Sequence, residues 1–300
     1  MLVINKDRAE EDLGQLAGVS DRGLRHTRNE DAFYISVAPT AEGPIAIAIV
    51  SDGVSSAPRP DEASFNAVTL AGKLLAEAVQ RGEDPGEASR TAVGAAGRKL
   101  VGLADRSDGA PAATYVSAVV SREKITVCWL GDSRAYWLAA ESPIAAGPND
   151  TIDITAGSRR LTRDDSLAEE IVAAGLASMD EAMASPQAHV ITRWLGADLP
   201  DPEPHVEEFI PTGPGVLLVC SDVLWNYRPE AAELAAMAMP TALTRPLDAA
   251  TRLVQFAIDS GGLDNITVVL IPFPPVAQNE PAGLDDTRSD LDPVPPTRID

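Results

Sequence analysis

Ile45-Ala-Ile-Ala-Ile-Val50-Ser51-Asp52-Gly53 is the stretch that decides the fold of this chain. Its apolar residues are rich in β-branched side chains, which predicts a buried strand. The strand ends in a carboxylate followed at once by a glycine, so it brings Asp52 to the rim of a sheet, where a turn leaves the oxygens open to a ligand. An Asp-Gly pair is also a common turn. The pair therefore points to chemistry only if other strand ends carry acids.

Other acids do stand beside predicted strands. Asp132 follows TVCWLG, Asp222 follows GVLLVCS, and Asp264 precedes the closing strand ITVVLIP. Glu30 and Asp31 stand before a further strand, AFYISVA. The chain has only 3 histidines and 2 cysteines, so this pattern favours hard cations held by oxygen, Mn²⁺ or Mg²⁺, over Zn²⁺.

Composition excludes several classes of protein. The 300 residues are 45% hydrophobic, enough for a sizeable core. The formal net charge of −21 argues against binding to nucleic acid or to anionic membranes. No run approaches the roughly 20 apolar residues of a membrane span, and the N-terminus has no apolar signal core. Cys128 and Cys220 lie in separate apolar runs, which predicts buried packing residues in a reducing compartment, the cytoplasm.

The order of predicted elements favours an α+β fold with helices layered on antiparallel sheets. Periodic apolar residues predict helices, and short β-rich runs predict strands. Helices are expected over 63–82, 85–105, 166–175, 180–185, 229–239 and 246–260. Strands at 113–120, 124–131 and 135–140 are separated by short turns, which predicts an antiparallel meander. The segment 200–214 is expected to be a surface connection with an exposed His205.

Both ends of the chain differ from the middle. Residues 1–15 are charged and lack a period, which predicts a flexible acidic lead-in. Residues 16–272 read as one folded domain. From residue 273 the sequence is rich in Pro and Asp, and it lacks the apolar side chains that would offset its ordering entropy. We therefore expect a disordered tail over 273–300.

Several motifs in order make the chain resemble a known family. They are SDRGLRHTRNED, VSDGVSSAPRPDEAS, LGDSRAYWL, LTRDDS, LLVCSDVLW and GGLDNITVVLIP. The chain resembles the metal-dependent Ser/Thr protein phosphatases of type 2C, in their bacterial form. The resemblance implies a four-layer α-β-β-α sandwich of two antiparallel β-sheets, in agreement with the layered arrangement above.

The same resemblance implies a centre of two Mn²⁺ or Mg²⁺ ions that activates a water to attack a phosphoester. Asp52 would bridge both ions, and the Gly53 carbonyl would bind one of them. Asp222 and Asp264 would ligate the other ion.

Further acids match the family's motifs. Glu30 and Asp31 correspond to the acidic pair that holds metal-bound waters. Asp132, in the GDSR motif, corresponds to a residue of a third, weaker metal site. The family's catalytic domain would thus span 16–272.

The phosphate-binding position departs from the family pattern. His26 stands where the bacterial family usually has an arginine, with Arg25 before it and Arg28 after it. A guanidinium suits a phosphate dianion because its planar fork donates two hydrogen bonds. We assign binding of the substrate phosphate to Arg25 as the first candidate and to Arg28 as the second. His26 either protonates the leaving group or packs as a turn histidine.

The loop after Asp52 also departs from the pattern. The family's DGxGG is DGVSS here, so Ser55 and Ser56 restrict backbone angles that glycines would allow, and we expect the loop to take another path. Val223 and Asp165 replace a customary glycine and histidine. None of these changes removes a presumed metal ligand.

The resulting function hypothesis is a protein-serine/threonine phosphatase acting on phosphorylated bacterial proteins, with a cognate kinase. Two alternatives stay open. One is a phosphoprotein-binding regulator of the same fold with little catalysis, and the other is a phosphatase specialised for a sigma-factor regulator. No oligomeric state is predicted. Residues 161–196 match the place where bacterial relatives carry a flap over the active site.

Overall fold

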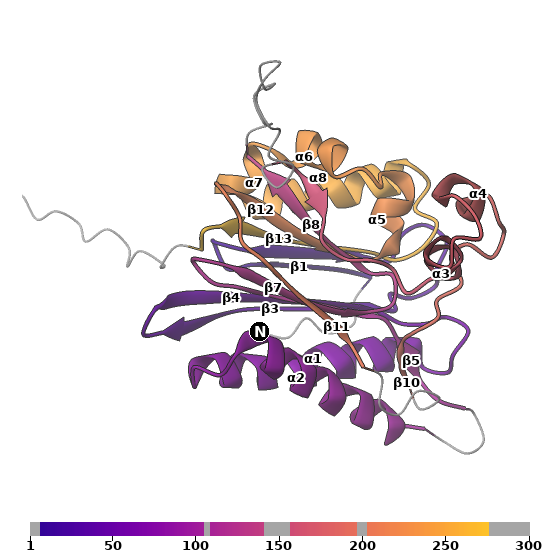
Figure 1. Ribbon diagram of the computed structural model, residues 1–300, viewed down its shortest axis with the longest axis horizontal. Helices are drawn as coiled ribbons and strands as arrows, with labels where there is room; N and C mark the ends of the chain where they lie inside the picture. The colour runs from indigo at the N-terminus through magenta and orange to yellow at the C-terminus, as the bar shows by residue number, and fades with distance from the viewer. Residues whose placement is uncertain (1–6, 105–108, 141–156, 197–202, 276–300) are drawn as a thin grey trace, which may run out of the picture.

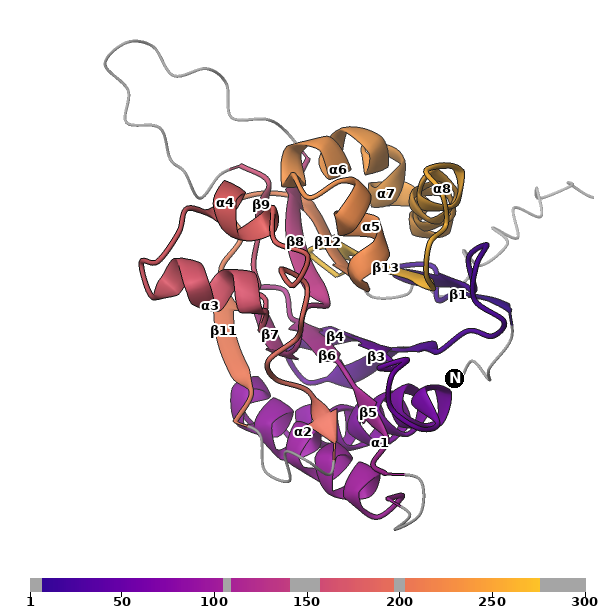
Figure 2. The same ribbon diagram turned by 90° about the vertical axis from the view of Figure 1, so that its right-hand side faces the viewer.

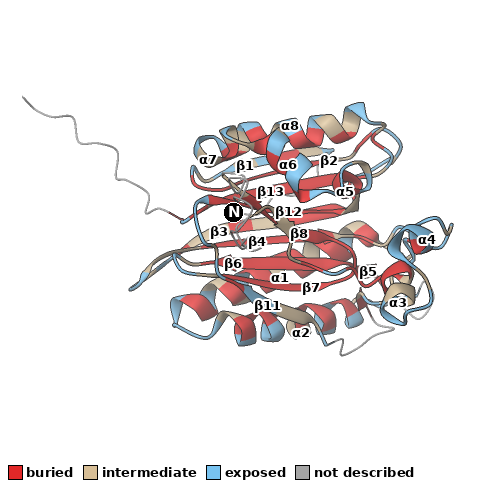
Figure 3. Ribbon diagram, turned by 45° about the horizontal axis from the view of Figure 1, so that its top comes forward, coloured by how far each residue is buried: buried red, intermediate tan, exposed pale blue. Residues whose placement is uncertain are grey.

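The computed structural model describes residues 7–104, 109–140, 157–196 and 203–275. Two antiparallel β-sheets lie face to face, and helices cover the outer face of each (Figure 1). The expected four-layer α-β-β-α sandwich is confirmed. Figure 3 shows that the strands at its centre are almost entirely buried.

One sheet has five strands in the order β11-β7-β6-β4-β3. Neighbouring strands are antiparallel throughout. Two helices cover its outer face (Figure 2). The elements are β3 (Asp31–Thr40), β4 (Gly43–Asp52), β6 (Tyr115–Val120), β7 (Ile125–Leu130), β11 (His205–Phe209), α1 (Pro60–Gln80) and α2 (Pro85–Val101).

The other sheet has six strands in the order β1-β2-β13-β12-β8-β9, and four helices lie on its outer side. Its elements are β1 (Arg8–Asp12), β2 (Ala17–Asp21), β8 (Arg134–Ala139), β9 (Arg159–Arg160), β12 (Gly215–Cys220), β13 (Ile266–Phe273), α5 (Asp222–Tyr227), α6 (Ala231–Ala238), α7 (Thr241–Thr244) and α8 (Pro246–Asp259).

A small unit stands beyond one end of the sandwich (Figure 1). It contains α3 (Leu167–Ala173) and α4 (Met179–Met183), packed around Ala168, Ala182 and Ala188. A short two-stranded sheet, β5 (Ala112–Ala113) with β10 (Leu195–Gly196), lies at the same end. Ser166 caps α3 and Ser178 caps α4, each by accepting a backbone N–H.

The central strand β4 shows why its sequence is continuously apolar. Ala46, Ala48 and Val50 face the other sheet, in the core between the two sheets. Ile47 and Ile49 face the opposite way, against the helices. Because both faces are buried, no alternation with polar residues arises.

The predicted meander of three strands is wrong. β6 and β7 pair, but β8 belongs to the other sheet, where it pairs with β12 and β9. Gly131 makes the change of sheet with a φ of 99°, a conformation that favours glycine. A short turn between strands thus crosses from one sheet to the other instead of closing a hairpin.

The expected surface connection at 200–214 is wrong for residues 205–209, and His205 is only partly exposed. Residues 205–209 form the edge strand β11, paired with β7. The His205 ring stacks on Trp129 with ring centres 4.9 Å apart. Its Nε2 lies 2.8 Å from Asp165 Oδ1. Tertiary contacts outweigh the low strand propensity of this acidic segment.

The boundaries of the two expected terminal segments differ from the structure. Residues 8–12 form β1, which pairs with β2 at the sheet edge, so part of the expected lead-in over 1–15 is an ordered strand. The charged residues of β1 are compatible with a strand because one side of an edge strand faces solvent. Phe273 belongs to β13 and packs edge-on against Trp137. Residues 1–6 and 276–300 lie outside the described part.

None of the helices in the described residues is long and apolar enough to cross a membrane. Cys128 and Cys220 are free and buried, as expected, one in each sheet. Burial raises the pKa of the Cys128 thiol to about 12. Both cysteines are therefore packing residues in the described structure.

The contact of α1 with β3 yields a prediction about stability. A Cβ at Gly72 would lie 2.5 Å from the base of the Tyr34 ring, which cannot move without shifting as a whole. Gly72→Ala should lower the free energy of unfolding by about 1–3 kcal/mol, measured by urea denaturation. Gly94→Ala in α2 is the matched control, because its Cβ meets only the flexible end of Arg98. It should be neutral or stabilising by up to about 1 kcal/mol, and equal losses in both variants would contradict the prediction.

Candidate metal centre and active site

The strand ends bring acids together at one rim of the sandwich. Asp31 opens β3 and lies directly opposite Asp52, the last residue of β4. Asp222 follows β12 as the first residue of α5, with Ser221 at the N-cap. Asp264 stands just before β13, which is antiparallel to β12. These sequence-predicted acids therefore come from both sheets.

Asp132 joins them because of the crossing between sheets. It lies in the turn between β7 and β8, next to Gly131. A Cβ at Gly131 would meet the Thr114 side chain at 2.9 Å, so the turn packs tightly against the end of β5. Trp225 in α5 donates its indole N–H to the Asp132 carbonyl at 3.0 Å. The turn is thus held from both sides.

Burial and crowding of like charges raise the pKa values of these carboxyl groups. Burial, followed by the charges of Asp31, Asp222, Asp132 and Asp264, raises the pKa of Asp52 well above its usual range. Burial is likewise the largest cause for Asp31, whose pKa rises to about 7, and for Asp222, whose pKa rises to about 6. The pKa of Asp132 is also raised, by burial and then by Asp222. Such a group of acids retains protons unless cations offset its charge.

The donor set fits divalent cations. Asp31 Oδ1 and Asp222 Oδ1 are buried and have no hydrogen-bond partner among the described residues. Carboxylate oxygens left open beside other carboxylates are the ligands that Mn²⁺ and Mg²⁺ prefer. Across residues 7–104, 109–140, 157–196 and 203–275, no three acid, histidine or cysteine side chains are already arranged as a ligand cluster.

A buried chain of hydrogen bonds fixes Asp31. The Thr267 hydroxyl donates to Asp31 Oδ2 at 2.7 Å, and Thr267 is 2.8 Å from the Ser20 hydroxyl. Asn29 Nδ2 donates to Ser20 Oγ at 2.8 Å. Since Thr267 donates to the carboxylate, it accepts from Ser20, and the whole chain of donors runs toward Asp31. Sequence reasoning missed Ser20 and Thr267, which are ordinary strand residues when read alone.

Asn265 anchors the loop that carries the predicted phosphate-binding residues. Its Nδ2 donates to the carbonyls of Arg22 at 2.8 Å and Arg28 at 3.1 Å. Its Oδ1 accepts from the Glu30 backbone N–H at 2.7 Å. Sequence reasoning missed this role, although Asn265 stands directly beside Asp264 in the GGLDN motif.

The three candidate phosphate-binding residues have different partners. Arg25 is exposed and has no ion-pair or hydrogen-bond partner in the described part of the chain. His26 Nε2 lies 3.0 Å from Asp264 Oδ1. Arg28 contacts Glu30 Oε1 at 2.9 Å and Asp61 Oδ1 at 3.3 Å. Only Arg25 is thus free to meet an anion without giving up an existing contact.

Gly53 is required by close backbone packing. Its N–H donates to the Glu30 carbonyl at 3.1 Å. A Cβ there would lie 2.3 Å from the Pro60 carbonyl oxygen, which no side chain tolerates. In the loop that follows, Ser55 Oγ donates to Glu30 Oε2 at 2.6 Å. Glu30 is therefore tied to the turn that ends β4.

A buried arginine joins the base of the α3–α4 unit to the rim. Arg134 makes two hydrogen bonds to Asp164, at 2.9 and 2.6 Å. Its guanidinium lies 3.5 Å above the centre of the Trp225 ring. Asp165 accepts from the Gly131 N–H at 3.0 Å. These contacts connect the LTRDDS motif to the turn that carries Asp132.

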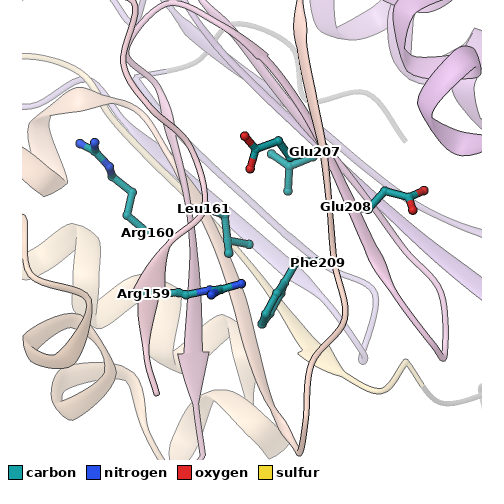
Figure 4. A pocket seen from close by; sticks show the side chains of 7 residues that line it. Arg159, Arg160, Leu161, Glu207, Glu208 and Phe209 are labelled. Carbon is teal, nitrogen blue, oxygen red and sulfur yellow. The ribbon is translucent and has the colours of Figure 1, made fainter. Parts of the chain in front are cut away.

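A separate cavity of about 250 Å³ opens between the edge strands β9 and β11 (Figure 4). Arg159 extends toward Phe209 there, with its guanidinium carbon 4.4 Å from the ring centre. The other lining residues are Val127, Arg160, Leu161, Glu207 and Glu208. None of the rim carboxylates lines this cavity, so it is distinct from the candidate metal centre.

Comparison with known proteins gives consistent matches. The family model described as protein phosphatase 2C matches residues 22–183. The serine/threonine phosphatase stp of Listeria innocua is 31% identical over 160 residues, which cover 53% of this chain and 55% of that protein. The chain thus spans about half the length of the curated relatives that it matches.

Solved structures match over more of the chain. The PPM Ser-Thr phosphatase MsPP from Mycobacterium smegmatis, in complex with cacodylate, has a TM-score of 0.67 at 27% identity, covering 86% of this chain and 97% of that one. The catalytic domain of the phosphatase PstP, in complex with 2 manganese ions, has a TM-score of 0.64 at 21% identity, covering 86% and 97%. The second match supports the fold alone.

The raised pKa of Asp31 predicts a loss of stability with rising pH in the metal-free protein. The unfolded chain releases this proton at about pH 3.9, whereas the folded chain holds it up to about pH 7. The protonated carboxyl of Asp31 therefore makes its full contribution to the free energy of unfolding below about pH 4. This contribution declines as the pH rises and is lost above about pH 7. In EDTA, the free energy of unfolding should fall less between about pH 5 and about pH 7.5 in Asp31→Asn than in the wild type.

Asp248→Asn is the control for this measurement, because Asp248 is an exposed carboxylate on α8. It should keep the wild-type pH dependence in urea denaturation. If Asp31→Asn behaved in the same way as Asp248→Asn, Asp31 would not titrate with a raised pKa.

Proposed function

Because the chain belongs to the protein phosphatase 2C family, we propose that it hydrolyses phosphoserine and phosphothreonine in proteins, with two Mn²⁺ or Mg²⁺ ions. The observation that carries this proposal is the crowding of carboxylates from both sheets at one rim, where burial and then the charges of Asp31, Asp222, Asp132 and Asp264 raise the pKa of Asp52. A fold without a cationic ligand gains nothing from this arrangement, because like charges oppose one another.

The residues at the rim divide into three roles in this proposal. Asp52 would be a ligand of both ions, the Gly53 carbonyl a ligand of one of them, and Asp222 and Asp264 ligands of the other. Glu30 and Asp31 would accept hydrogen bonds from metal-bound waters. Asp132 would belong to a third, weaker metal site.

When bound, the ions supply an activated water and neutralise charge on the phosphate. The protein's own groups position them. The donor chain through Ser20 and Thr267 engages Asp31 Oδ2 and leaves the buried Oδ1 without a partner among the described residues, and the Asn265 contacts hold the loop 22–30 in place. These rigid supports favour one arrangement of ligands.

Arg25 is the proposed phosphate-binding residue. Its exposure and lack of partners leave the guanidinium available for two hydrogen bonds to a phosphate dianion. Arg28 is committed to Glu30 and Asp61. His26, held beside Asp264 at 3.0 Å, is the proposed proton donor to the leaving group.

The proposed biological setting is bacterial signalling in the cytoplasm, in which a cognate kinase phosphorylates the substrate proteins. The two unpaired buried cysteines are consistent with a reducing compartment.

The bridging role of Asp52 predicts the effect of its removal. Asp52→Ala should lower kcat for a phosphothreonine peptide by roughly 100-fold or more in the presence of Mn²⁺, because the ions lose a shared ligand. Phosphate release measures the effect, and Asp248→Ala on α8 is the matched surface control. Wild-type turnover in Asp52→Ala would contradict the proposal. Absence of Mn²⁺-dependent turnover in the wild type would favour the phosphoprotein-binding alternative.

The proposed role of Arg25 predicts a selective effect on substrate binding. Arg25→Ala should lower kcat/KM about 10- to 100-fold, chiefly through KM, because a hydrogen bond to a charged group is lost. Arg28→Ala tests the other assignment, and steady-state kinetics with the same phosphopeptide compares the two. A larger loss in Arg28→Ala, with little change in Arg25→Ala, would assign phosphate binding to Arg28 instead of Arg25.

A further inference from the structure

The Glu30 carboxylate is held by two protein donors, one on each oxygen. Arg28 Nε donates to Oε1 at 2.9 Å, and the Ser55 hydroxyl donates to Oε2 at 2.6 Å. The side chain is only 10% exposed. Two donors on different segments therefore set both the position and the rotation of the carboxylate plane.

The backbone of Glu30 is fixed as well. Its N–H donates to Asn265 Oδ1 at 2.7 Å. Its carbonyl accepts from the Gly53 N–H at 3.1 Å and from the Ser64 hydroxyl at 2.5 Å. With the backbone held from three sides, the remaining freedom of Glu30 lies in its side chain, which Ser55 and Arg28 restrain.

Ser55 stands where the family's DGxGG pattern has a glycine, so this contact has no counterpart in that pattern. Its neighbour Ser56 also replaces a glycine, but Ser56 is exposed and makes no hydrogen bond within the described residues. Ser55 and Ser56 thus both replace a glycine, but only Ser55 contacts Glu30 among the described residues.

We propose that Ser55 is a positioning residue of the metal centre, which acts by holding Glu30 in the orientation that receives metal-bound water. This inference rests on the proposed function, because it assumes that the centre binds divalent ions. A carboxylate has about four lone-pair sites, so the bonds from Ser55 and Arg28 leave acceptor capacity for a water. Outer-shell groups that support a metal centre typically change metal affinity about 10- to 100-fold when they are removed.

The test measures Mn²⁺ affinity by isothermal titration calorimetry, without substrate. Ser55→Ala should bind Mn²⁺ about 10-fold more weakly than the wild type. Ser56→Ala is the matched control and should bind as the wild type does. Circular dichroism in EDTA should show the same secondary structure for all three proteins, which excludes misfolding as the cause of a weaker affinity.

A double-mutant cycle separates positioning from other effects. In the Glu30→Gln background, Ser55→Ala should cause little further loss of Mn²⁺ affinity, because the group it positions is already altered. Equal Mn²⁺ affinity in Ser55→Ala and the wild type would overturn the inference, as would an unchanged effect of Ser55→Ala in the Glu30→Gln background. Failure of the wild type to bind Mn²⁺ at all would instead overturn the proposed metal centre.

Discussion

Repulsion among the carboxylates at one rim of the sandwich is the constraint on which the rest of the structure depends. Asp52 lies within electrostatic reach of Asp31, Asp132, Asp222 and Asp264, and its pKa is raised first by burial and then by the charges of these acids. A flexible backbone would relax by moving the acids apart. The strands prevent this because both of their faces are buried. β4 lies between the six-stranded sheet and α1, and β12 lies between the five-stranded sheet and α8.

Much of the fold was predictable because apolar runs with two buried faces are strong signals. β4, β12 and β13 are of this kind, and the acids beside them lie at one rim of the sandwich. The change of sheet at Gly131 was not predictable, because a short turn between two apolar strands has the same sequence pattern whether it closes a hairpin or crosses a sandwich. β11 was missed because it lies in an acidic segment rich in proline. Its stability comes from pairing with β7 and from the contact of His205 with Trp129 and Asp165.

The candidate site was predictable in its acids but not in their supports. Carboxylates at strand ends carry a local signal, whereas Ser20 and Thr267 acquire meaning only when β2 and β13 pair and place both hydroxyls beside Asp31. The DGVSS loop is an intermediate case. Its departure from DGxGG was visible in the sequence, but the engagement of Ser55 with Glu30 depends on loop geometry.

The crossing at Gly131 has a mechanical consequence. Asp132 lies in the turn between β7 and β8, which belongs to neither sheet. Asp52 ends a strand of one sheet, and Asp264 stands just before a strand of the other. Any sliding of one sheet over the other must therefore change the spacing among these acids. The apolar layer between the sheets, in which Trp137 packs edge-on against Phe209 and Phe273, opposes such sliding because its side chains are closely packed.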